Sequence, residues 1–207
     1  NNYETIKKLD YIGKSTCIIT QNGYDNSFNY GHVGCSILSY SKRIMNEVFN
    51  TCNENKLPIY YTDTDSIHMN YDDINKLSTE YKKIYNKELV GKNLGQFHND
   101  FELKGAESEI YAIKSIFLGK KSYIDLLESK DKNNNLIQGV HYRLKGITDA
   151  GINYESKKHN GIFNFYKHLA TGQKTEILLN PKGEKVLFEY KKDGVITRNE
   201  FTRTVKF

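Results

Sequence analysis

Two short apolar runs separated by an acidic tetrapeptide constrain the fold of this chain more than any other feature. Residues 59–61 read Ile-Tyr-Tyr, residues 62–65 read Thr-Asp-Thr-Asp, and residues 66–69 read Ser-Ile-His-Met. β-Branched and aromatic residues on both sides of a short polar segment are typical of two antiparallel strands joined by a tight turn. We therefore predict a hairpin whose tip carries Asp63 and Asp65.

Helical patterns flank this hairpin on both sides. Between residues 36 and 49 the apolar residues recur at offsets of three, four and seven, which places them on one face of an amphipathic helix. The residues expected on its opposite, solvent-facing side are Lys42, Arg43, Asn46 and Glu47. Residues 71–89 show the same periodicity. Two helices beside one hairpin indicate an α+β layer with the sheet covered on one face.

The rest of the chain is rich in strand patterns. The expected elements are strand and loop over residues 1–30, a strand over 111–127, a turn over 131–135, a returning strand over 136–144, a short helix over 161–169 and a hairpin turning at Asp193-Gly194. A change of pattern near residues 146–154 suggests a boundary. We therefore predict two domains, residues 1–145 and residues 146–207.

Composition excludes several classes of protein. The 207 residues are 38% hydrophobic and 27% charged, close to an ordinary globular chain once glycine is counted. No apolar run approaches the roughly 20 residues of a membrane span, and no signal-peptide pattern is present. Cys17, Cys35 and Cys52 lack metal-type spacing and indicate reduced thiols of an intracellular protein. These features exclude a secreted mini-protein, a collagen, a zinc finger and a membrane protein.

Charge is distributed unevenly along the chain. The balance of Lys and Arg against Asp and Glu is −2 over residues 1–102 and +7 over residues 103–207. A basic half behind a more acidic one suits a carboxylate-bearing site beside a surface for polyanions. The basic residues of the last third considered for this surface are Lys157, Lys158, Lys182, Lys191 and Lys192. On composition alone, an ordinary solvated surface is the better explanation of such a lysine excess.

The paired aspartates give the hairpin its chemical interest. Two carboxylates placed two residues apart repel each other when both are ionised, and a bound divalent cation removes that penalty. Oxygen ligands that leave room for water and phosphate are typical of Mg²⁺ sites. The alternative is an ordinary Asp- and Thr-rich turn stabilised by bonds to its own backbone. Between two apolar strands, we favour the metal site.

Residues 61–66, Tyr-Thr-Asp-Thr-Asp-Ser, resemble motif C of the family B DNA polymerases, whose usual form is Tyr-Gly-Asp-Thr-Asp-Ser. Thr62 occupies the position where glycine is commonest, and this departure also occurs among protein-primed members of the family. Residues 117–124 resemble the Lys-x-Tyr motif of the same family, with Lys121 and Tyr123 at its defining positions. Weaker similarities to the palm helix, to the segment that follows the palm helices and to the thumb lie in residues 37–45, 94–98 and 146–149.

The resemblance implies a fold and a role for each matched residue. The fold would be an α+β polymerase palm, an antiparallel sheet with helices on one face, over residues 1–145, followed by a small β-rich thumb over residues 146–207. Asp65 would ligate Mg²⁺ directly, and Asp63 would support the same site. The residues implied in binding DNA are Tyr61 beside the primer end, Ser66 behind the turn, Lys121 on the phosphate backbone and Tyr123 against the duplex.

Family B polymerases also need motif A, Asp-x-x-Ser-Leu-Tyr-Pro, and a fingers helix that carries motif B. Neither pattern occurs in this sequence, and its first residue is Asn1. We therefore expect a fragment of a polymerase that performs template-directed, two-metal nucleotidyl transfer in DNA replication, inactive alone because its metal site is incomplete. The implied partners are primer-template DNA and deoxynucleoside triphosphates, with a terminal protein primer in the protein-primed branch of viruses, linear plasmids and mitochondrial plasmids.

Two other functions stay open. A non-enzymatic module that binds duplex DNA, or the remnant of a polymerase gene, accounts for the basic second half and for the missing motifs. Another metal-dependent phosphotransferase with a similar hairpin, such as a nucleotidyl cyclase, accounts for Asp63 and Asp65 but leaves Lys121 and Tyr123 unexplained.

Overall fold

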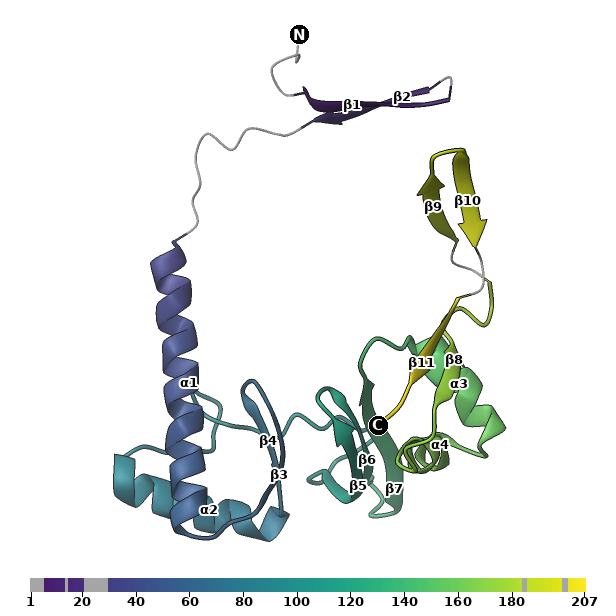
Figure 1. Ribbon diagram of the computed structural model, residues 1–207. Helices are drawn as coiled ribbons and strands as arrows, with labels where there is room; N and C mark the ends of the chain where they lie inside the picture. The colour runs from purple at the N-terminus through teal and green to yellow at the C-terminus, as the bar shows by residue number, and fades with distance from the viewer. Residues whose placement is uncertain (1–5, 14, 21–29, 184–185, 199–200) are drawn as a thin grey trace.

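The computed structural model of the protein describes residues 6–13, 15–20, 30–183, 186–198 and 201–207, which form an α+β structure of four helices and several small antiparallel sheets (Figure 1). The helices are α1 (Gly31–Glu54), α2 (Tyr71–Tyr85), α3 (Asp149–Lys158) and α4 (Ile162–Leu169). The strands are β1 (Ile6–Ile12), β2 (Ser15–Thr20), β3 (Ile59–Asp63), β4 (Ser66–Met69), β5 (Tyr111–Gly119), β6 (Ser122–Lys130), β7 (Leu136–Leu144), β8 (Thr175–Leu178), β9 (Leu187–Lys191), β10 (Gly194–Arg198) and β11 (Thr202–Val205).

A first hydrophobic core joins α1, α2 and the β3–β4 hairpin. Its buried side chains are Val48, Cys52, Leu57, Leu77, Tyr81 and Leu89. Ile67 and Met69 of the hairpin pack against this core. Charge placement supports α2, because acidic Asp72 and Asp73 occupy its first turn and basic Lys82 and Lys83 its last, as the helix dipole favours.

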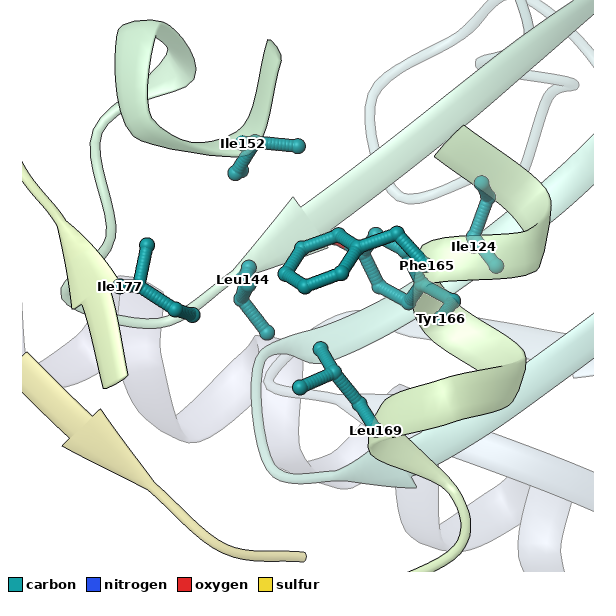
Figure 2. Close-up of a cluster of buried hydrophobic side chains, with 7 residues drawn as sticks. All are labelled: Ile124, Leu144, Ile152, Phe165, Tyr166, Leu169 and Ile177. Carbon is teal, nitrogen blue, oxygen red and sulfur yellow. The ribbon is translucent and has the colours of Figure 1, made fainter. Parts of the chain in front are cut away.

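A second core lies on the antiparallel sheet β5-β6-β7, which α3 and α4 cover on one face. Its buried side chains are Ile124, Leu144, Ile152, Phe165, Tyr166, Leu169 and Ile177, which converge in Figure 2. Thr148 begins α3 by accepting a hydrogen bond from the Gly151 N–H at 3.2 Å. This core crosses the predicted boundary at residue 146, because it joins β6 and β7 to α3, α4 and β8. The division into two domains stays a prediction.

The β3–β4 hairpin lies between these two parts of the molecule. Figure 1 shows α1 and α2 on one side of the hairpin and the β5-β6-β7 sheet on the other. Ile67 faces the first core, whereas its neighbour His68 contacts aromatic rings of β5 and β6. The hairpin is therefore held on both faces, and its tip is presented where the helical part meets the sheet.

The structure confirms the predicted hairpin, with Asp63 paired to Ser66 across a two-residue loop. The turn over residues 131–135 and the hairpin at Asp193-Gly194 are also present. Within the predicted strand-and-loop region, β1 pairs with β2, and residues 1–5, 14 and 21–29 lie outside the described residues. All three cysteines are free. In the described part of the chain, no helix is both long and apolar enough to cross a membrane.

The helix predicted around residues 36–49 is present as α1. Three other local expectations were wrong. Helix α2 ends at Tyr85 instead of residue 89, because Asn86 adopts a left-handed backbone with φ +53°. The segment 111–127 is two strands, since Lys121 also turns left-handed at φ +57°. Residues 149–158, next to the suggested boundary, form helix α3, and the boundary itself stays a prediction.

The third error concerns Glu47, which was expected on the solvent-facing side of its helix. Lys42, Arg43 and Asn46 are exposed as expected, but Glu47 is buried. Its carboxylate accepts hydrogen bonds from Arg43 Nε at 2.8 Å and from the Tyr81 hydroxyl at 2.7 Å. Burial raises the pKa of Glu47, but these two donors outweigh it and leave the pKa below its ordinary value. A carboxylate can occupy this core edge because it is paired there.

Candidate functional site

The tip of the β3–β4 hairpin is a tight turn that its own side chains stabilise. The Asp65 N–H donates to the Asp63 carbonyl at 2.7 Å, and the Ser66 hydroxyl donates to the same oxygen at 3.0 Å. Ser66 thus supports the turn in the manner that the resemblance implies. Thr64 sits at φ +55°, a conformation that a β-branched residue rarely adopts. Its hydroxyl donates to Asp63 Oδ1 at 3.2 Å.

The two aspartates of the turn lie in different electrostatic surroundings. Asp63 is 20% exposed and forms an ion pair with Lys121, whose Nζ lies 2.7 Å from Asp63 Oδ2. The hydrogen bond from Lys121 lowers the pKa of Asp63, and the same bond raises the pKa of Lys121. Asp65 is exposed, and among the described residues its carboxylate has no hydrogen-bonding or ion-pairing partner. Asp63 is therefore neutralised locally, whereas Asp65 is open to solvent.

Lys121 belongs to the turn between β5 and β6, and this turn meets the acidic one. Its backbone N–H donates to the Tyr61 hydroxyl at 2.8 Å, while its ammonium reaches Asp63. The two contacts connect segments about 60 residues apart in the sequence. The charge of the neighbouring Lys120 also lowers the pKa of Asp63, but less than Lys121 does.

Beneath the turn lies an aromatic cluster of Tyr61, His68, Phe117 and Tyr123. The Tyr61 ring stacks on Phe117 with centroids 5.4 Å apart and an interplanar angle of 2°. Tyr123 lies 5.0 Å from Tyr61 and 5.1 Å from His68. Tyr123 is 9% exposed, and burial raises the pKa of its hydroxyl. Its ring packs inside the protein, so its implied contact with duplex DNA is limited to a small exposed edge.

Asp125 is a residue of this region that sequence reasoning missed. It is fully buried on β6, directly opposite Ser115 of β5 and His141 of β7. The Ser115 hydroxyl donates to Asp125 Oδ1 at 2.6 Å, and His141 Nδ1 lies 3.4 Å from Oδ2. Across the interface, His68 Nδ1 lies 3.7 Å from Oδ1. An aspartate between the apolar pairs at residues 123–124 and 126–127 was the available signal.

The charge of Asp125 is stabilised despite its burial. Burial alone raises the pKa of a carboxyl group, because a low-polarity surrounding disfavours the ionised form. Here His141, His68 and Ser115 outweigh burial and lower the pKa of Asp125 to about 2. The carboxylate is therefore ionised at neutral pH. His68 lies against both this carboxylate and the aromatic cluster.

The carboxylates of the turn match Mg²⁺ in kind but not in number. Asp63 and Asp65 offer the hard oxygen donors that Mg²⁺ prefers. Within the described ranges, however, no three residues of the His, Cys, Asp and Glu types are grouped so that they could hold a metal ion. Asp63 would also have to release Lys121. The turn can supply two ligands and needs a further one from outside the described residues.

The basic residues of the last third of the chain differ in their surroundings. Lys157 and Lys192 are exposed, whereas Lys158 pairs with Glu155 at 2.8 Å and lies over the Tyr154 ring. The side chain of Lys191 lies outside the described residues. Their expected contact with DNA stays a prediction.

Comparisons of the chain with known protein families, with curated proteins and with solved structures found no match. The resemblance to family B polymerases therefore depends on the motifs in the sequence, and the α+β structure is compatible with a palm without identifying one.

Proposed function

We propose that this chain forms part of the catalytic centre of a family B DNA polymerase, contributing motif C and the Lys-x-Tyr motif to a palm. One observation carries the proposal: the two motifs converge in space. Lys121 contacts both Asp63 and Tyr61, and Tyr123 packs against Tyr61. Two unrelated surface turns about 60 residues apart in the sequence are not expected to contact each other through their charged side chains.

In this proposal Asp65 would be the direct ligand of Mg²⁺, because its carboxylate is exposed and has no hydrogen-bonding or ion-pairing partner in the described structure. Asp63 would support the same site if its carboxylate were released from Lys121. Bound Mg²⁺ would neutralise the triphosphate and the developing charge of phosphoryl transfer. Lys121, once released, carries a positive charge that suits a phosphate of the primer strand.

The same proposal explains why the isolated chain should not polymerise. The turn offers two carboxylates, and the sequence contains neither motif A nor motif B. We therefore expect weak binding of divalent cations and no primer extension by this chain alone. Activity requires a polypeptide that supplies a third carboxylate and a nucleotide-binding helix.

A second candidate function is a non-enzymatic module that binds duplex DNA, and the Asp63–Lys121 ion pair favours it. A carboxylate already neutralised at 2.7 Å has less need of a metal ion. This candidate predicts binding that weakens steeply with salt, is indifferent to DNA sequence and does not depend on Asp63 or Asp65.

Paramagnetic Mn²⁺ separates the two candidates in the chain as it is. We expect Mn²⁺ to broaden the NMR signals of residues 63–66 selectively, and Asp65→Asn to remove this effect. Asp131→Asn is the matched control, since Asp131 is also the carboxylate of a hairpin turn, where it accepts hydrogen bonds from Asn133 and Asn135. Equal broadening at both turns, or none at residues 63–66, would count against the polymerase proposal.

A further inference from the structure

Asp125 is a buried carboxylate to which the proposed reaction assigns no role. Its side chain is completely inaccessible to solvent, and a charge in such a place destabilises the fold unless the groups around it compensate. Three polar side chains face it, from three different strands: Ser115, His141 and His68. The role of Asp125 therefore depends on the side chains that contact it.

Two of these groups belong to the same sheet as Asp125, and one does not. Ser115 and His141 are its direct neighbours across β5 and β7, so their contacts form one polar row within the sheet. His68 comes from β4 of the opposing hairpin, and its side chain is only 16% exposed. The contact between Asp125 and His68 therefore bridges the hairpin and the sheet.

His68 is also connected to the acidic turn. It is paired in register with Tyr61 across the hairpin and packs edge-on against the rings of Tyr61 and Phe117. Tyr61 in turn accepts the Lys121 N–H, and Lys121 reaches Asp63. An unbroken set of contacts thus runs from Asp125 to the tip of the hairpin.

We infer that Asp125 is a positioning residue that, by holding His68, fixes the hairpin and its acidic turn against the Lys121 turn. At 3.7 Å the His68 contact exceeds hydrogen-bond length, so the attraction is electrostatic and needs the carboxylate charge. The positioning of the hairpin by Asp125 does not depend on the proposed function. The consequence of this positioning for metal binding rests on the proposed function.

Amide hydrogen exchange at Lys121 tests the inference, because this N–H is protected only while Tyr61 remains in place. The Ile147 N–H, which donates to the Leu144 carbonyl at 3.0 Å, serves as an internal reference outside the hairpin contact. We expect Asp125→Asn to lower the protection of Lys121 relative to Ile147 by about tenfold, the loss of one hydrogen bond of typical net strength.

Two further variants show whether the effect runs through His68. His68→Gln should lower the relative protection of Lys121 as much as Asp125→Asn does, and combining the two should add nothing more. Glu47→Gln is the matched control, since Glu47 is another buried carboxylate that accepts a hydrogen bond, in its case from Tyr81 in the first core. This variant should leave the ratio of exchange protection between Lys121 and Ile147 unchanged.

The inference is overturned if Asp125→Asn leaves this ratio unchanged, or if the two variants add independently. Should Asp125→Asn fail to fold, nitrogen-15 NMR of the unaltered chain decides. We expect a proton on His68 Nδ1, facing Asp125, and an unprotonated Nδ1 would refute the contact.

Mn²⁺ broadening at residues 63–66, measured in parallel, separates this inference from the proposed function. Weaker Mn²⁺ binding in Asp125→Asn than in the unaltered chain supports both. If the unaltered chain binds no Mn²⁺ there, the proposed function fails, while the exchange result still decides the role of Asp125.

Discussion

Lowering the pH should reduce the free energy of unfolding of this protein, because Asp125 loses its charge. The pKa of this carboxyl is about 2 in the folded protein, against an ordinary value of 3.8. Because the folded-state pKa is depressed, the ionised group stabilises the fold at every pH above about 4. This contribution is lost as the pH falls through the folded-state value near 2. At about 1.4 kcal/mol per pH unit, the difference corresponds to roughly 2–3 kcal/mol.

Asp125→Asn isolates this contribution, because the amide has nearly the same shape and does not ionise. We expect the variant to be less stable than the unaltered chain at pH 7, with a difference in the free energy of unfolding that narrows by about 2 kcal/mol between pH 5 and pH 2. Urea unfolding followed by circular dichroism at several pH values measures both chains. A gap that stays constant over this range would refute the reasoning, since the charge of Asp125 would then contribute nothing.

Three further predictions concern other parts of the molecule. Phe165→Ala, which empties a fully buried position in the second core, should lower the free energy of unfolding by about 3–5 kcal/mol in urea denaturation; a cost below about 1 kcal/mol would contradict the packing in Figure 2. Lys121→Met should raise the pKa of Asp63 toward its ordinary value, as a carbon-13 NMR titration of the carboxyl would show, and an unaltered titration would exclude the ion pair in solution. Thr64→Asn should stabilise the protein by about 1 kcal/mol in thermal unfolding, because Asn tolerates the left-handed backbone better, and a lower melting temperature would show that the threonine hydroxyl matters more.

The parts of the fold that depend on neighbouring residues could be predicted from the sequence. The β3–β4 hairpin follows from two apolar runs around a polar turn, and α1 and α2 follow from helical periodicity, although their ends do not. The end of α2 depends on the left-handed Asn86, and the break in the strand at Lys121 depends on the same kind of turn. Neither residue is glycine, so the sequence carried no strong signal for them.

The buried charges could not be predicted, because each depends on partners distant in the sequence. Glu47 is compensated in its buried position partly by Tyr81, 34 residues away, which donates to its carboxylate. Asp125 is ionised in the interior because His141 and Ser115 on the neighbouring strands, and His68 on a different hairpin, face it. Helical periodicity alone places a glutamate outside, and strand alternation alone does not reveal which polar groups meet across an interface.

The same limit applies to the candidate site. Asp63, Asp65, Lys121 and Tyr123 were selected from motifs. In the structure Lys121 contacts Asp63 and Tyr61, and Tyr123 packs against Tyr61. It also shows what the motifs did not indicate: Lys121 neutralises Asp63, and Tyr123 is largely buried. The ion pair makes the availability of Asp63 to a metal the open step of the proposal.

Primer extension by the polypeptide encoded by the whole reading frame that contains this chain tests the central claim most directly. With a primer-template, deoxynucleoside triphosphates and Mg²⁺, we expect extension that Asp65→Asn abolishes and that the control Asp131→Asn retains. Extension by the Asp65→Asn variant at the full rate would contradict the assignment of the acidic turn as the metal-binding centre of a polymerase.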